Sequence, residues 1–140
     1  MNKKLYKRDG RRFVPVEDLT GQIREVEGTK AICILQTTTE RYWAELDNSN
    51  KSMTYHEALD YVKTRFNRKG ILPTRSLILL LRDKYKKRVN INGWGYWTAD
   101  VYESDINYVW GLVWAHCGIY NYHRNDKYGS YARAFLIENI

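Results

Sequence analysis

The sequence predicts an α+β protein in which two helices pack against a curled antiparallel sheet. Three observations support this: a capped apolar helix near residues 54–66, a second helix after Thr74, and strand-like apolar segments on both sides of the helices. This order is typical of folds that segregate their helices to one part of an antiparallel sheet. With 140 residues the chain is long enough for one domain with its own core, and we expect residues 1–140 to form it.

Residues 1–30 are expected to form an N-terminal strand and its connection to the rest of the domain. Residues 11–16 (RRFVPV) are typical of a short strand. Pro15 places this strand at an edge or an end, because proline cannot donate to a sheet ladder. Residues 18–30 combine mixed charge with two glycines, which favours a connecting loop or a short helix.

A β-hairpin is predicted next. Residues 31–35 are a continuous apolar run of strand length, and residues 42–46 follow the polar turn 37–41. Cys33 lies in the first of these strands, and Cys117 lies in a later apolar stretch. Both are expected to be buried, reduced thiols, because free cysteine packs as a small hydrophobe, although the spacing does not exclude a disulfide. No spacing of cysteine and histidine resembles a zinc site.

The first helix has the clearest local signals. Thr54 and Glu57 form a capping box, in which the threonine hydroxyl and the glutamate side chain each satisfy a free backbone N–H. An apolar stripe follows at helical spacing, and Gly70 is expected to end the helix. The stripe consists of Tyr55, Ala58, Leu59, Val62 and Phe66.

A second helix is expected after Thr74. Pro73 disfavours a helical residue before it, and the Thr74 side chain can accept a hydrogen bond as the N-cap. The helix is expected to stop near residues 89–90. Its wide apolar face consists of Leu77, Ile78, Leu80, Leu81 and Tyr85.

Strands are predicted again after the second helix. Residues 96–98 begin one strand, and residues 109–115 (VWGLVWA) alternate as a strand does. Residues 120–123 and 131–137 (YARAFLI) are expected to be further strands, separated by the polar turn 124–130. The late part of the chain therefore supplies most of the sheet.

Residues 94–137 are expected to display the ligand-binding strands and loops. Four of the five tryptophans and seven of the twelve tyrosines lie between residues 94 and 131. Tyrosine and tryptophan offer large, stiff contact areas, and asparagine, serine and glycine offer adaptable hydrogen bonds, which is the mixture found in binding paratopes. The region lacks the nucleophile, base and metal-ligand spacings of an active site. We therefore expect a recognition surface without catalysis, metal or cofactor.

Alternation divides the side chains of residues 109–115 between two faces. Trp110, Leu112 and Trp114 share one face and, together with Trp97, are expected to belong to the core. Residues at bends or on the opposite face are the expected ligand contacts, although Tyr120 and Tyr122 fit an inward or an outward position. The candidate contacts are Asp100, Tyr102, Asp105, Asn107, Gly111, Val113, His116, Tyr120, Asn121, Tyr122, His123, Asn125 and Tyr128.

The net charge of +7 lies largely in residues 3–12 and 82–88. The second run falls at the end of the predicted helix, where cations favour the negative end of the helix dipole and stay solvated. A nucleic-acid site needs basic and aromatic residues interleaved on one face, and the aromatic-rich region supplies only Arg124, Lys127 and Arg133. Nucleic acid is therefore not the expected partner.

We expect neither a membrane-spanning segment nor a secretory signal peptide in this sequence. No apolar run approaches the roughly 18–20 residues that span a bilayer. The basic N-terminus continues into polar residues 9–12, where a secretory signal has its apolar segment. We expect cytoplasmic synthesis, with incorporation in a phage particle or display at a surface by another route.

Five motifs, in the correct order, resemble one family of C-type-lectin-fold domains. Residues 53–58 (MTYHEA) resemble the start of its first helix, and residues 71–74 (ILPT) resemble its RLPT segment. Residues 96–99 (YWTA), 109–114 (VWGLVW) and 131–134 (YARA) resemble three of its strands. The pattern resembles the Fibrobacter-type major paralogous and Lcl-like domains. It also resembles variable proteins of diversity-generating retroelements.

The resemblance covers about residues 52–137 and implies a C-type-lectin-like fold with a non-covalent binding face. The implied partner is a protein or glycan on another cell or particle, and an oligomer is compatible with this role. In the retroelement systems, adenine mutagenesis scatters asparagine codons into residues such as Tyr, Asp and His at displayed positions. Residues 100–128 are rich in that set, although a lectin-like surface without diversification fits the sequence equally. Arg133 is expected to make a structural hydrogen-bonded pair, as in the family.

Departures from the family's pattern leave other functions open. Ile71 stands where the family usually has arginine, and the triplets that hold calcium and sugar in calcium-dependent lectins are not matched. One alternative is an enzyme related to formylglycine-generating proteins, which would need a reactive thiol such as Cys117. Another is a structural component of a phage or pilus surface.

Overall fold

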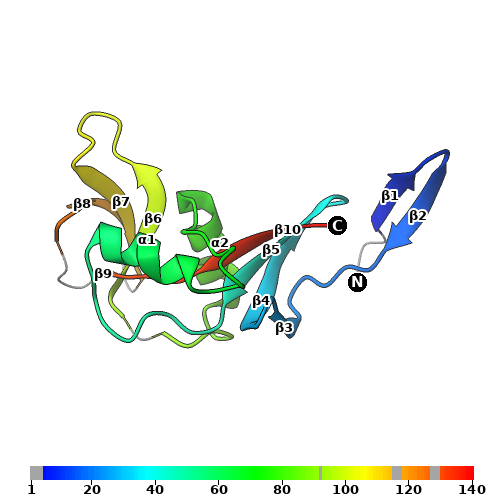
Figure 1. The fold of residues 1–140 in the computed structure, drawn as a ribbon, viewed down its shortest axis with the longest axis horizontal. Coiled ribbons are helices and arrows are strands. Elements are labelled where there is room, and N and C mark those ends of the chain that lie inside the picture. The colour runs from blue at the N-terminus through cyan, green and yellow to red at the C-terminus, as the bar shows by residue number, and fades with distance from the viewer. Residues whose placement is uncertain (1–4, 92, 115–117, 127–129) are drawn as a thin grey trace.

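Two helices and ten strands make up the part of the chain that the structure describes. The computed structural model describes residues 5–91, 93–114, 118–126 and 130–140. The architecture is α+β with mostly antiparallel sheets, which confirms the predicted class. Figure 1 shows two four-stranded sheets and an N-terminal hairpin that projects from them.

The first sheet, here called the scaffold sheet, contains β3 (Ile23–Val26), β4 (Thr29–Gln36), β5 (Glu40–Glu45) and β10 (Phe135–Asn139). Its order is β10-β5-β4-β3, and all its pairs are antiparallel. The predicted β4–β5 hairpin is confirmed. The expectation of a loop or short helix within residues 18–30 is wrong for β3. Glu27 and Gly28, both with positive φ, turn the chain so that β3 can pair with β4.

The second sheet, here called the aromatic sheet, contains β6 (Gly95–Val101), β7 (Tyr108–Val113), β8 (Gly118–His123) and β9 (Ser130–Tyr131). Its order is β8-β7-β6-β9, and only the β6–β9 pair is parallel. The strand predicted at 131–137 is therefore divided between two sheets. The chain leaves the aromatic sheet after β9, crosses at Ala132–Ala134, and joins the scaffold sheet as β10.

Helix α1 (Tyr55–Lys63) begins with the predicted capping box. The Glu57 backbone N–H donates to Thr54 Oγ1 at 3.3 Å, and the Thr54 N–H donates to Glu57 Oε1 at 3.0 Å. The helix ends earlier than its apolar stripe predicts, because Phe66, Asn67 and Arg68 adopt positive φ. Phe66 is nevertheless fully buried, so the stripe continues into a non-helical segment.

Helix α2 (Arg75–Tyr85) begins at the predicted cap, where the Leu77 N–H donates to Thr74 Oγ1. It ends at Tyr85, a few residues before the predicted stop. Among the described residues, no helix combines the length and apolar character needed to cross a membrane.

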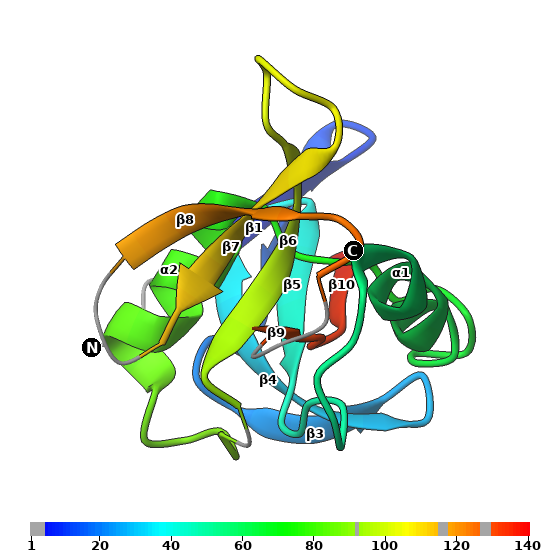
Figure 2. The same ribbon diagram turned by 90° about the vertical axis from the view of Figure 1, so that its left-hand side faces the viewer.

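The aromatic sheet lies between the two helices, which flank the body on opposite sides in Figure 2. Trp97 and Val109 belong to a buried cluster with Ala58, Val62 and Phe66 from α1 and the segment after it. Leu112 and Tyr96 belong to a second cluster with Leu77, Ile78 and Leu81 of α2. The helices therefore pack against opposite faces of this sheet, and the core position predicted for Trp97 and Leu112 is confirmed.

Arg133 lies at the crossing between the sheets and is fully buried. Its guanidinium donates to the backbone oxygens of Glu45, Leu46 and Asp47 after β5, and to the backbone oxygen of Asn90 after α2. The guanidinium also lies 5.5 Å from the centre of the Tyr96 ring. The predicted structural role of Arg133 is confirmed. The side chain bonds to several loops, whereas the prediction gave it a single partner.

Glu45 is a buried carboxylate next to this crossing. Arg65 Nε lies 2.7 Å from Glu45 Oε1, and the Tyr61 hydroxyl and the Ala134 N–H donate to the carboxylate. Burial raises the pKa of Glu45, while the charge of Arg65 opposes that change. The side chain therefore links β5, the segment after α1 and the start of β10.

Candidate binding face

The burial of the side chains on the two faces of β7 differs from the prediction. Val113 is 2% exposed, and Gly111 is buried where an added Cβ would lie 2.9 Å from the Tyr122 ring. Trp110 and Trp114 are only half-buried. The assignment of Gly111 and Val113 to ligand contacts, and of Trp110 to the core, is therefore wrong. The reason is that α1 and Tyr122 cover the Gly111 side, whereas α2 covers only the Leu112 part of the other side. Trp114 is half-buried and packs against the second cluster, next to Tyr96.

One group of half-exposed side chains gathers on the Trp110 side of the sheet. The strand register places Trp110 opposite Asn121 and Tyr108 opposite His123, so all four share a face. Tyr102 joins them, because its backbone N–H donates to the Tyr108 backbone oxygen at the end of β6. We call these five residues the polar-aromatic face: Tyr102, Tyr108, Trp110, Asn121 and His123.

Edge-to-face ring contacts order this face. The rings of Tyr102 and Trp110 lie 5.3 Å apart, and those of Tyr108 and His123 lie 5.4 Å apart, both at steep angles. Such pairs are the favoured geometry for aromatic rings and contribute about 0.5–1.5 kcal/mol beyond buried area. The rings are therefore held in fixed positions.

An ion pair borders the face at the N-terminus of α2. The Arg75 guanidinium lies 4.9 Å above the Trp110 ring, and Arg75 Nε is 3.3 Å from Asp100 Oδ2. Asp100 also accepts a hydrogen bond from the Arg75 backbone N–H at 2.8 Å. Asp100 was predicted as a ligand contact, and the structure places it at the rim, where it holds Arg75. Arg75 itself was not predicted, since nothing in the sequence shows that α2 begins beside β7.

Hydrogen-bonding groups on the face can serve a polar partner. His123 Nδ1 accepts from the Asn125 backbone N–H at 3.1 Å, so a neutral ring carries its proton on Nε2 and can donate there. The indole N–H of Trp110 is covered and is not available to a partner. The Asn121 amide is exposed. The arrangement combines fixed rings with free donors and acceptors, which suits non-covalent recognition.

The other predicted contacts lie away from this face. Asp105 and Asn107 are exposed in the β6–β7 connection, where Asp105 Oδ1 accepts from the Asn107 N–H. Tyr120 is 51% exposed on the opposite side of the sheet. Tyr122 is on that side too and packs edge-on against Trp97, with ring centres 6.1 Å apart.

Three predicted contacts remain. Asn125 lines a small cavity of about 100 Å³ beside α1, together with Tyr55, His56, Leu59 and Arg124. His116 and Tyr128 fall outside the described residues, as does Cys117. The face thus brings together Tyr102, Asn121 and His123 from the prediction and adds Tyr108 and Trp110.

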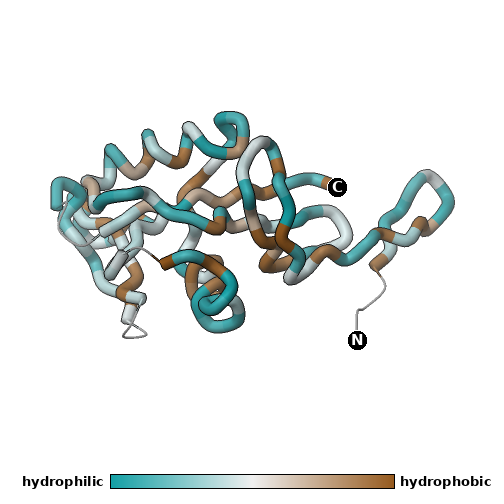
Figure 3. The backbone as a smooth tube through the Cα atoms, turned by 90° about the horizontal axis from the view of Figure 1, so that it is seen from below, coloured by the Kyte–Doolittle hydropathy of each residue, from teal (hydrophilic) through white to brown (hydrophobic). Residues whose placement is uncertain are grey.

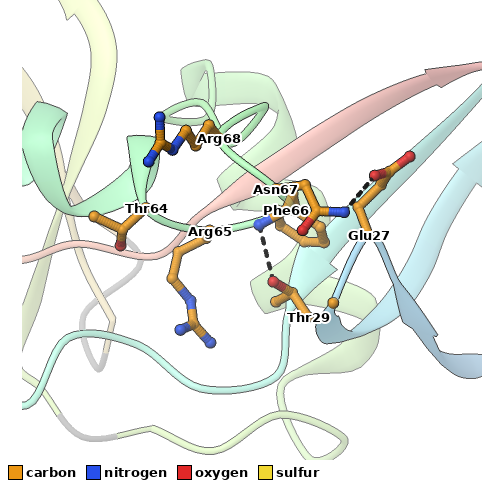
Figure 4. A pocket seen from close by; sticks show the side chains of 8 residues that line it. Glu27, Thr29, Thr64, Arg65, Phe66, Asn67 and Arg68 are labelled. Carbon is orange, nitrogen blue, oxygen red and sulfur yellow. Dashed lines mark hydrogen bonds between the residues drawn. The ribbon is translucent and has the colours of Figure 1, made fainter.

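A larger cavity of about 370 Å³ lies beside the segment that follows α1 (Figure 4). Its polar groups bind one another: Thr29 Oγ1 accepts from the Phe66 N–H at 2.9 Å, and Asn67 Nδ2 donates to Glu27 at 2.8 Å. These bonds hold the positive-φ residues in a conformation that costs about 1–3 kcal/mol per residue. The cavity is therefore explained by the structure of the turn.

Cys33 is a free and fully buried thiol, as predicted. Burial raises the pKa of this thiol to about 11, so it stays protonated at neutral pH. Within the described ranges, no group of three or more His, Cys, Asp and Glu side chains is placed to hold a metal ion. No protein-family model matches the chain, and no curated protein matches it.

Proposed function

We propose that this chain is a non-enzymatic binding protein with a C-type-lectin-like fold. Its polar-aromatic face binds a protein or glycan on another cell or particle. The observation that carries the proposal is the gathering of four half-exposed rings and the exposed Asn121 on one side of the aromatic sheet, beside the N-terminus of α2. None of the five belongs to either buried cluster.

Physical properties of the face support recognition. Ring pairs fixed by edge contacts lose little conformational freedom when a ligand binds, so their contact area contributes fully to affinity. Trp110 lies at the centre, with Tyr102, Arg75 and Asn121 around it. Tryptophan, tyrosine and arginine are the residues enriched in binding hot spots. The underlying sheet is held by two helices, which gives the face a rigid support.

The proposal predicts a separation between binding and stability. Tyr102→Ala, Asn121→Ala or His123→Ala should weaken binding about tenfold or more, while the melting temperature changes by only about 2 °C or less. The measurement applies the fluorescently labelled protein to a glycan array and to a panel of intact bacterial cells. Melting is followed by circular dichroism.

Tyr120→Ala is the matched control, because Tyr120 is an exposed tyrosine on the opposite side of the same sheet. It should leave binding unchanged. Equal loss of binding in Tyr120→Ala would remove the assignment to this face. Unfolding of the three face variants would show that these side chains serve stability instead.

We further propose that the gene is diversified by a retroelement. If so, a near-identical template copy of the coding region should differ from it at adenines, and the altered codons should include those for Tyr102, Asn121 and His123. The codons for Trp97, Gly111 and Val113 should be unchanged, because these residues are buried. Sequencing the neighbourhood of the gene tests this. Copies that differ evenly over buried and exposed positions would contradict it.

A further inference from the structure

The N-terminal hairpin belongs to neither sheet. β1 (Leu5–Asp9) and β2 (Arg12–Val16) pair only with each other, from Leu5 opposite Val16 to Asp9 opposite Arg12. Figure 1 shows the hairpin projecting away from the body. An isolated two-stranded hairpin is marginally stable in water at best. A partner that binds the hairpin would therefore also stabilise it.

Aromatic and basic side chains alternate on one face of this hairpin. Tyr6 lies opposite Pro15 and Arg8 lies opposite Phe13, so Tyr6, Arg8 and Phe13 share a face. Phe13 is 72% exposed and Tyr6 is 45% exposed. Diagonal neighbours in such a pair are about 7–8 Å apart. Two exposed rings with a guanidinium beside them are thus presented together.

The hairpin is also strongly basic. Lys7, Arg8, Arg11 and Arg12 face solvent, against a single carboxylate at Asp9. In the described part of the chain, no ion pair joins Lys7, Arg11 or Arg12 to an acidic side chain. Figure 3 shows hydrophilic residues around the tip of the hairpin. This uncompensated charge attracts a polyanion and repels a basic partner.

A groove of about 560 Å³ separates the ring-bearing face from the body. The hairpin side is lined by the two rings, two cations and one carboxylate of Tyr6, Phe13, Lys7, Arg8 and Asp9, and the body side by Thr38, Thr39 and Ile140. The threonines belong to the β4–β5 turn, and threonine hydroxyls are common contacts for phosphate oxygens. The groove therefore offers rings, cations and hydroxyls to one extended occupant.

We propose that the hairpin binds single-stranded nucleic acid in this groove. Bases stack on Tyr6 and Phe13, and phosphates contact Lys7 and Arg8, the two cations that line the groove. Proteins that bind single strands combine these two features, because every base has a face that can stack on a ring. In a duplex those faces are already stacked, and an acidic polypeptide has no such faces. The single strand is thus the occupant that uses both the rings and the charge.

The test compares three labelled probes by fluorescence anisotropy at physiological salt. They are a mixed-sequence DNA strand of about 12 nucleotides, its duplex, and polyglutamate of equal charge. The single strand should bind most tightly, with affinity that falls steeply as salt rises. Equal or tighter binding of the duplex or of polyglutamate would overturn the proposal, and so would the absence of single-strand binding.

Two variants separate stacking from charge. Phe13→Ala keeps every cation and should weaken single-strand binding about 5- to 150-fold, as expected for one lost stacked base. The double change Lys7→Gln with Arg8→Gln, at the two cations that line the groove, should reduce the slope of log K against log salt by about two. Both variants should keep the wild-type melting temperature, because the hairpin contributes to neither core cluster.

The matched control is the double change Lys86→Gln with Lys87→Gln, which removes the same charge just after α2. It should leave single-strand binding within about twofold of wild type, because salt-dependent affinity follows the cations that contact phosphates. A loss as large as that of the hairpin double variant would show that net charge alone drives binding and would overturn the proposal. Binding through the polar-aromatic face should be unaffected by the hairpin variants, so the two proposals can fail separately.

Discussion

Replacing Arg133 with methionine is expected to lower the free energy of unfolding by at least about 3 kcal/mol. The methionine fills much of the volume but donates no hydrogen bond to the backbone oxygens of Glu45, Asp47 and Asn90. Each buried acceptor left without a donor costs roughly 1–3 kcal/mol. Urea denaturation followed by circular dichroism measures the loss.

Arg88→Met is the matched control for this change. Arg88 donates to the Gly21 backbone oxygen from an exposed position, where water can replace the guanidinium. The control should lose less than about 1 kcal/mol. Arg133→Lys should lie between the two, because one ammonium cannot reach both the loop after β5 and the Asn90 oxygen. Equal stability of Arg133→Met and Arg88→Met would contradict the structural role.

Trp97→Ala is expected to destabilise the protein by about 3–5 kcal/mol, the range found when a large core aromatic is removed. Trp97 is fully buried, its indole N–H donates to the Met53 backbone oxygen at 2.8 Å, and its ring packs edge-on against Tyr55 and Tyr122. The change removes the ring that joins β6 to α1 and to β8. Thermal and urea unfolding both report it.

Trp94→Ala serves as the comparison, because Trp94 lies next to the same strand but is 56% exposed. Its loss should change the free energy of unfolding by less than about 1 kcal/mol. Unfolding is followed by far-ultraviolet circular dichroism, since both changes alter tryptophan fluorescence. Similar losses for the two variants would mean that Trp97 does not anchor the sheet.

Local signals account for the parts of the fold that the sequence predicts well. The capping box at Thr54 and the cap at Thr74 each involve residues only three positions apart. Both helix starts can therefore be predicted from the local sequence. The β4–β5 hairpin follows from two apolar runs and a polar turn. Helix ends were less predictable, because Phe66 keeps its buried position after the backbone has left the helix.

Long-range packing decides what the sequence could not reveal. In β7, Val109 and Val113 alternate with Trp110 and Leu112, so both faces are apolar and alternation cannot tell which one a helix covers. The division of residues 131–137 between two sheets depends on the burial of Arg133, which no local pattern shows. Arg75 reaches Trp110 only because α2 begins beside β7.

The basic N-terminus illustrates the same limit. The aromatic-rich C-terminal region holds few cations, so the sequence predicts no nucleic-acid site there. The pairing of β1 with β2 was not predicted, and it is this pairing that places Tyr6, Arg8 and Phe13 on one face. Aromatic and basic residues that are not interleaved along the sequence can therefore lie side by side on one face of a strand pair.

The order of strands in the scaffold sheet affects how well the protein tolerates inserted residues. β5 and β10 are neighbours in register, from Ala44 opposite Phe135 onward, yet the whole of β6 to β9 lies between them in the chain. The segment 46–134 is thus an insertion whose two ends are tied together by the β5–β10 pair, and within it the β6–β9 pair joins Gly95 to Ser130. Each doubling of a flexible loop adds only about 0.6 kcal/mol of closure entropy. Lengthening the β6–β7 connection therefore strains the ends of the insertion very little.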